Sequence, residues 1–250
     1  MPDRESLIAQ RAKGAASEHW FFEFRKRRAS RQRARAAAIA EHADLVRAAD
    51  AQQAQDQQVL DDYWQRLLTG DEDAVMATLA RALEDNDAES APVGYDGGLA
   101  CVVVRVPDAQ TLPDRIPGTT AAGNLSLRKA SKTQWHALYT LMIAGYVVVT
   151  AKEVLAVAPP VREVGVVAIR RTAPDAYGER RPEALMAVRF TRESLEGVQW
   201  DEADALQVVT DASTDHALDQ HGVARELRPL DPTVHPDVAA ALDVIDLDEE

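Results

Sequence analysis

Seven cations lie close together near the N-terminus of the 250-residue sequence: Arg25, Lys26, Arg27, Arg28, Arg31, Arg33 and Arg35. We call this stretch the basic segment. No acidic residue occurs from position 26 to 40, and Arg27, Arg31 and Arg35 are spaced to share one helix face. Like charges one helical turn apart destabilise a helix by roughly 0.2–0.5 kcal/mol per pair, and a negatively charged partner reverses that cost. The basic segment is therefore the candidate anion-binding site.

Three kinds of partner could supply the negative charge. Nucleic-acid phosphate is one, and the acidic C-terminal part of this chain, or another protein, is a second. An anionic membrane surface is the third and least favoured. In that case an aromatic cluster would act as an apolar wedge: Trp20, Phe21, Phe22 and Phe24. A solvated helix face that binds nothing is the simplest alternative.

The sequence contains none of the common catalytic or metal-binding motifs. It has no H-E-x-x-H, G-x-S-x-G, Walker lysine or C-x-x-C pattern, and its six histidines are dispersed. Gly118 and Gly123 have the spacing of a phosphate-binding loop, but Asn124 stands where the lysine should be. A strand pattern follows instead of a helix. We therefore expect no catalytic residue, no metal and no cofactor.

A divergent metal-dependent nuclease is the enzymatic alternative. Such a site needs carboxylates on neighbouring strands, and four acids flank predicted strands: Asp96, Asp108, Glu163 and Glu183. The lysine expected two residues after the glutamate is replaced by Gly165 in one case and by Leu185 in the other. We expect these acids to be structural unless a pocket brings them together with a cation.

The single cysteine, Cys101, lies in the apolar run 99–106, which we predict to be a strand buried on both faces. We expect a buried, structural thiol, because a nucleophile needs exposure and a nearby base. One cysteine excludes a disulfide framework and suits a reducing cytoplasm. The sequence has no run of 18 apolar residues and its N-terminus lacks the layout of a signal peptide. We therefore expect a cytoplasmic protein without a membrane-spanning helix.

The elements that would position the basic segment begin with one long helix. No proline or glycine occurs from about residue 15 to 68, and helix-forming residues dominate. Apolar residues recur there at multiples of seven, with Gln53 interrupting the series: Ile39, Val46, Leu60 and Leu67. A helix of this length exceeds the width of a compact domain. We predict coiled-coil association through residues 37–68, with a second copy or another protein, the alternative being a helix that lies across its own domain.

The remaining sequence indicates an α+β fold. Apolar runs at 99–106, 125–127, 146–149, 164–169 and 184–190 predict strands, the last two forming an antiparallel hairpin. Capping patterns at Asp71, Ser131 and Thr150 predict helices that end near residues 84, 145 and 158. Acids at 201–204 and Pro236 predict two more helices. The intervals around Pro92 and from 107 to 124 are expected to be a linker and a long loop.

Charge is distributed unevenly along the chain. The formal net charge is −13, yet the first 190 residues are neutral overall, and residues 191–250 carry the whole excess. We predict three parts: a helical arm (1–70), an α/β core domain (71–190) and an acidic C-terminal segment packed on the core (191–250). The fold class is α+β, a mixed sheet domain with a long N-terminal helical arm.

These observations favour a non-enzymatic, acidic interaction protein of the cytoplasm. Its long helix would join it to another copy, giving a homo-oligomer, or to another protein, and the basic segment would contact an anion. The alternative is a nucleic-acid-acting protein, including the divergent metal-dependent nuclease.

Overall fold

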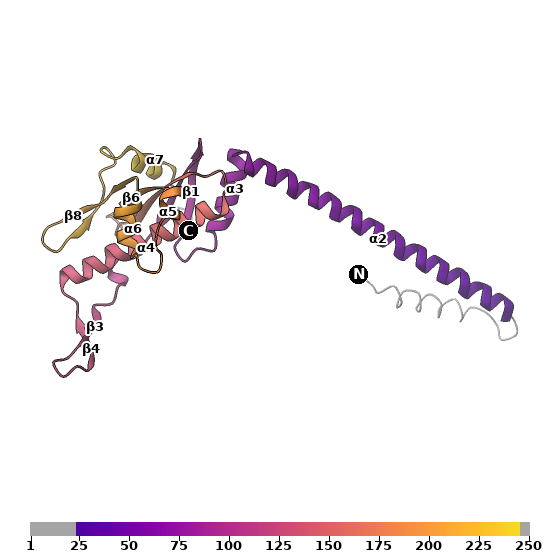
Figure 1. Cartoon of the computed structure of the whole chain (residues 1–250), viewed down its shortest axis with the longest axis horizontal. Helices are drawn as coiled ribbons and strands as arrows, with labels where there is room; N and C mark the ends of the chain where they lie inside the picture. Colours follow the sequence, from indigo (N-terminus) through magenta and orange to yellow (C-terminus); the bar gives the residue numbers. More distant parts are fainter. Residues whose placement is uncertain (1–23, 246–250) are drawn as a thin grey trace. The chain divides into compact units, whose positions relative to one another are not determined.

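The computed structural model describes residues 24–245 and confirms the α+β fold class with a long N-terminal helix (Figure 1). The chain divides into two compact units, one ending at Trp64 and the other beginning at Gln65. The predicted borders after residues 70 and 190 stay predictions. Each unit is described by itself below.

The described part of the first unit lies within helix α2, Phe24–Leu68, whose last four residues belong to the second unit. Its 45 residues include no proline or glycine, and at 1.5 Å per residue they extend about 68 Å. Figure 1 shows α2 as one uninterrupted helix. It ends where Gly70 adopts a left-handed conformation (φ 76°), and the Gly70 amide donates back to the Leu67 carbonyl at 3.0 Å. The single helix predicted for this stretch is thus confirmed over the described residues.

Helix α3, Glu72–Leu83, begins at the predicted cap. The Asp71 carboxylate accepts a hydrogen bond from the Ala74 amide at 3.0 Å, and it also accepts one from Arg66 Nη2 at 2.6 Å. Val75 and Leu79 are fully buried, so this helix belongs to the core of the second unit.

A five-stranded mixed sheet forms the centre of the second unit. Its strands, in spatial order, are β1 (Ser90–Asp96), β2 (Leu99–Arg105), β5 (Glu163–Arg171), β6 (Pro182–Thr191) and β7 (Asp215–Ala217). β2 and β5 are parallel, and every other neighbouring pair is antiparallel. The predicted β5–β6 hairpin is confirmed.

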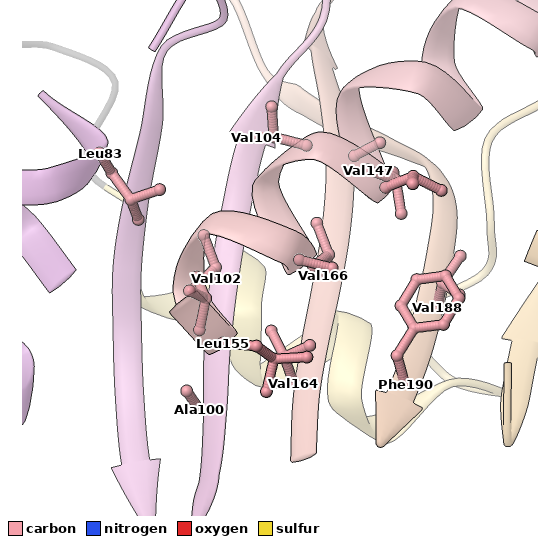
Figure 2. Close-up of a cluster of buried hydrophobic side chains, with 14 of the residues drawn as sticks. Leu83, Ala100, Val102, Val104, Val147, Leu155, Val164, Val166, Val188 and Phe190 are labelled. Carbon is pink, nitrogen blue, oxygen red and sulfur yellow. The ribbon is translucent and has the colours of Figure 1, made fainter. Parts of the chain in front are cut away.

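Helix α4, Lys132–Val157, crosses from β2 to β5 and covers one face of the sheet. Figure 2 shows its side chains Val147 and Leu155 packed against valines of β2 and β5 and against Phe190 of β6. The helix starts at a complete capping box, in which Ser131 and Gln134 each accept from the other's backbone amide. Among the described residues, α4 is the helix long and apolar enough to cross a membrane, but half of that stretch is buried inside the unit.

The strand predicted at 146–149 and the separate helix after it are wrong, because α4 runs through both. Val147 is buried at helical spacing from Ile143, Ala151 and Val154, so one face of a continuous helix reaches the sheet. Packing of this face outweighs the local β preference of the valines. Thr150, predicted to start a helix, lies inside α4 and is buried.

Two strands form where the sequence predicts a linker and a loop. β1 is an edge strand, where Pro92 costs no ladder hydrogen bond, and a bulge separates Pro92 from Gly94. β3 (Arg115–Thr119) pairs with β4 (Leu125–Lys129) in an antiparallel hairpin inserted between β2 and α4. A short 3₁₀ turn, Ala109–Thr111, precedes it.

The C-terminal region contributes to both faces of the sheet. It contains α5 (Arg192–Glu196), α6 (Ala205–Ala212), β8 (Asp219–His221), β9 (Glu226–Arg228) and α7 (Pro236–Val244). α6 begins at the cap Asp204 and packs against α4, whereas α7 packs on the other face, where Val238 joins Val103 and Val167 in a second, smaller core. The helix starts predicted at residues 201–204 and at Pro236 are both confirmed.

Candidate functional site

The basic segment occupies the first turns of α2. The side chains of Arg25 and Arg27 lie outside what the structure describes, as do the residues of the aromatic cluster before Phe24. The other five cations are exposed: Lys26, Arg28, Arg31, Arg33 and Arg35. Within the described part of the chain, Arg31 and Arg35 have no hydrogen-bond or ion-pair partner. Their charge is therefore available to an anion from outside this helix.

Apolar side chains along α2 are also exposed to solvent. Ile39 is 42% exposed and Leu60 is 62% exposed, and other large apolar residues of α2 share this state: Leu45, Val46, Val59 and Trp64. The fourth member of the predicted seven-residue series behaves differently, because Leu67 is buried in the core of the second unit. Three of the four heptad positions thus face solvent on α2.

Acidic side chains follow the basic segment on the same helix. Asp56 accepts a hydrogen bond from Gln52 Nε2 at 2.7 Å, and Asp61 accepts one from Gln57 Nε2 at 2.8 Å. Neither bond neutralises the carboxylate, since glutamine is uncharged. α2 therefore carries positive charge at its start and negative charge in its second half.

A second basic surface lies on the β3–β4 hairpin. Lys132, at the start of α4, adjoins the three cations of the hairpin strands, and all four are exposed: Arg115, Arg128, Lys129 and Lys132. The hairpin stands away from the sheet in Figure 1, and its two strands pack mainly on each other. Leu125 is 89% exposed and Leu127 is 64% exposed. An isolated two-stranded hairpin is marginally stable in water. Contact with another surface would stabilise this hairpin by covering its exposed leucines.

The hairpin is a surface that the sequence prediction missed in part. A strand is predicted at 125–127, but Arg115 lies in the predicted loop 107–124. The register pairs Arg115 with Lys129 across the two strands. The signal available in the sequence was the turn at Gly123–Asn124, and it is weak because Pro117 and Gly118 lie inside β3 and disfavour a strand.

A polar pocket of about 410 Å³ lies at the carboxyl ends of β2 and β5. Of the four acids considered for a nuclease, Asp108 and Glu183 line it, together with Arg170, His136 and Tyr139. Asp96 and Glu163 lie at the opposite end of the sheet, as their pairing with Leu99 shows.

The groups in this pocket are engaged with partners in the chain. Glu183 Oε2 accepts two hydrogen bonds from Arg170, from Nε and Nη2, each 3.0 Å long. Asp108 caps the following turn by accepting from the Gln110 amide at 2.9 Å. Burial raises the pKa of Tyr139, so its hydroxyl stays protonated at neutral pH and donates to the Pro107 carbonyl at 3.1 Å. Within residues 24–245, no group of three or more His, Cys, Asp or Glu is placed to hold a metal ion.

A second pocket, of about 460 Å³, lies between α7 and the sheet and contains Cys101. The prediction of a strand buried on both faces is wrong at this residue, because α7 is short and leaves Cys101 only partly covered. Burial raises the pKa of the Cys101 thiol, the Asp237 carboxylate raises it further, and the Arg189 guanidinium opposes both. The thiol is therefore protonated at neutral pH and is a poor nucleophile.

Exposed charge thus gathers on α2 and on the β3–β4 hairpin, while Cys101 and the Arg170–Glu183 pair each line a pocket of the second unit. The function of this chain has to be inferred from these features, because no family model, no curated protein and no solved structure matches it.

Proposed function

We propose that this chain is a non-enzymatic interaction protein that associates with a second copy through α2 and uses the basic segment as an anion contact. The observation that carries the proposal is the exposure of Ile39, Val46 and Leu60 along a helix about 68 Å long. A helix in a protein gains most of its stability by burying its apolar face against another surface. Pairing with another helix supplies that burial.

The proposal is tested by sedimentation of the full chain. Wild type is compared with the variant Ile39→Gln, Val46→Gln, Leu60→Gln, and with a control that adds glutamines at exposed alanines elsewhere on the helix: Ala37→Gln, Ala40→Gln and Ala51→Gln. We expect the wild type and the alanine-to-glutamine control to be oligomeric. The variant that carries glutamine at positions 39, 46 and 60 should be monomeric. A wild type that stays monomeric over the accessible concentration range would overturn the proposal.

A nucleic-acid-binding protein is the second candidate, and the β3–β4 hairpin favours it. A two-stranded ribbon fits a nucleic-acid groove, and exposed Arg and Lys neutralise phosphates. The catalytic form of this candidate, a metal-dependent nuclease, is less favoured, because Glu183 is paired with Arg170 and Asp108 caps a turn. Binding of duplex and single-stranded oligonucleotides, titrated with salt, tests the candidate.

The cytoplasm is the proposed location. A single thiol that is partly buried and protonated suits a reducing compartment. Fractionation of cells that express the chain with a small epitope tag would test this, and recovery in a membrane or extracellular fraction would contradict it.

A further inference from the structure

We infer that α2 pairs with α2 of a second copy in the antiparallel direction, so that the basic segment of one copy lies along the acidic half of the other. This inference rests on the proposed self-association. It adds the direction and register of the pairing and the identity of the anion, which is the carboxylates of the second copy.

Charge along α2 distinguishes the two directions of pairing. The first 13 residues of the helix, 24–36, contain all seven cations of the basic segment and no acid. The rest of the helix contains six acids: Glu41, Asp44, Asp50, Asp56, Asp61 and Asp62. Only two cations, Arg47 and Arg66, lie among them. Parallel pairing sets like charges side by side, whereas antiparallel pairing sets opposite charges side by side.

The charged and apolar residues also lie on one face of the helix. Side chains separated by three, four or seven residues share a face. Such steps connect a series that we call the shared face: Arg28, Arg31, Arg35, Ile39, Val46, Asp50, Gln53, Asp56 and Leu60. Along this face, cations come first, two apolar residues occupy the middle, and acids follow.

One antiparallel register makes the middle of the shared face complementary to its copy. When Ile39 of one copy lies opposite Val46 of the second copy, Arg35 lies opposite Asp50 of the second copy. Arg31 then lies within one helical turn of Asp56 of the second copy. By the two-fold symmetry of an antiparallel pair, each of these contacts occurs twice.

The same register explains the polar interruption of the heptad series. Gln53 lies opposite Gln32 of the second copy, so the two amides can hydrogen-bond in a polar layer. A buried polar pair of this kind specifies register at some cost in stability. Glu41 is set against Asp44 of the second copy, and Arg47, which pairs with Asp44 on its own helix, supplies the countercharge.

The surroundings of these side chains within one chain agree with this pairing. Arg31, Arg35 and Asp50 make no ion pair among residues 24–245, and Asp56 is bonded to an uncharged glutamine. Each therefore keeps its charge for a partner outside the helix.

Charge reversal tests the direction. In the full chain, Arg31→Glu with Arg35→Glu should raise the dimer dissociation constant at least tenfold, and so should Asp50→Lys with Asp56→Lys. The four changes combined in one chain should restore dimerisation, because the opposite charges face each other again. Lys26→Glu with Arg33→Glu changes the same number of charges off the shared face and is the matched control. Failure of the combined variant to recover would overturn the antiparallel arrangement.

Cross-linking tests the register. Gln32→Cys and Gln53→Cys are made singly in a Cys101→Ala background, which removes the single native thiol. Under mild oxidation, an equimolar mixture should give mainly the mixed disulfide between the two variants. Homodisulfides alone would indicate a parallel pair and overturn the inference while leaving self-association intact. A wild type that is monomeric in sedimentation would instead remove the proposed function as well.

Discussion

Cys101 and Gly165 are direct neighbours in the parallel register of β2 and β5, and a Cβ placed on Gly165 would lie 3.8 Å from the Cys101 sulfur. That distance is an ordinary van der Waals contact, and the φ angle of Gly165 is not positive. Neither backbone conformation nor crowding requires glycine at this position. The missing side chain leaves open the pocket beneath α7, which Gly165 and Cys101 both line.

Gly165→Ala should therefore stabilise the fold. Glycine in a strand interior costs conformational entropy, and alanine should recover about 0.5–1 kcal/mol. Urea unfolding measures the change. Gly70→Ala is the contrasting variant, because Gly70 has φ 76° and a Cβ there would lie 3.0 Å from the Tyr95 hydroxyl. It should destabilise the fold, and equal effects of the two substitutions would contradict this account.

The thiol of Cys101 should alkylate slowly at neutral pH, with a midpoint above that of a free cysteine. Burial and Asp237 raise its pKa, and Arg189 lowers it. Asp237→Asn should therefore shift the midpoint of the pH–rate profile down, and Arg189→Gln should shift it up. The rate of iodoacetamide labelling measures both. Because the chain has one cysteine, the signal needs no assignment. Arg189 Nη2 also donates to Asp237 Oδ2 at 2.6 Å, and midpoint shifts in the same direction would show that this ion pair acts only by holding α7 in place.

Asp71 should make the stability of the fold depend on pH in the acid range. The Ala74 amide and the Arg66 guanidinium lower its pKa below the ordinary value of 3.8. A carboxyl with a lowered pKa contributes stability above its unfolded-state value, and that contribution is lost as the pH falls through the folded-state value.

The thermal midpoint of Asp71→Ala should accordingly lie below wild type at neutral pH, and the gap should narrow in strong acid. Asp62→Ala removes an exposed carboxylate from α2 and is the control. A gap that stays constant with pH would show that the charge of Asp71 contributes nothing.

The Arg170–Glu183 pair should contribute to stability and not to catalysis. Its side chains retain 25% and 30% of their exposure, so removing one partner leaves the other partly buried. Glu183→Ala should cost roughly 1–3 kcal/mol, and the double variant Arg170→Met, Glu183→Leu should recover part of that loss. Denaturant unfolding of wild type, the double variant and its two single variants measures the coupling free energy between Arg170 and Glu183. Metal-dependent cleavage of oligonucleotides by wild type, absent from Glu183→Ala, would revive the nuclease interpretation.

The two basic surfaces should respond differently to neutralisation. If the α2 cations are occupied by carboxylates of the second copy, replacing Arg27, Arg31 and Arg35 by Gln should alter assembly more than nucleic-acid binding.

Replacing Arg115, Arg128 and Lys129 by Gln should leave the melting of the core unchanged. On duplex DNA it should flatten the salt dependence by up to about 0.9 log unit for each phosphate that is no longer neutralised. Binding that is absent in wild type even at low salt would remove nucleic acid as a partner.

Residues that end or begin helices were the most informative part of the sequence. Asp71, Ser131 and Asp204 each accept a hydrogen bond from the first turn, as their types predict, because capping depends on local chemistry alone. The valines at 147–149 could not be assigned in this way. Their state depends on which surface they pack against, and α4 packs on a sheet whose strands lie far away in the sequence.

The candidate sites were predictable to a similar, partial extent. The basic segment is evident from residue types, and the shared face of α2 follows from spacing. The convergence of Asp108, Glu183 and Arg170 in one pocket was not predictable, since it depends on the register of β5 against β6 and on the position of α4. β1 was missed because Pro92 is tolerated only at an edge, and edge position is a property of the assembled sheet.

The parallel pairing of β2 with β5 also governs how the chain reaches its native state. Between Arg105 and Glu163 the chain contains a turn, a hairpin and the whole of α4, so the pairing of the two central strands is non-local. Helices form within about a microsecond, whereas such non-local pairing takes milliseconds to seconds. During synthesis, the apolar face of α4 leaves the ribosome before β5 and β6 exist to cover it. This protein is therefore most prone to aggregation during its synthesis. At that stage, chaperones or rapid folding must protect the exposed apolar face of α4.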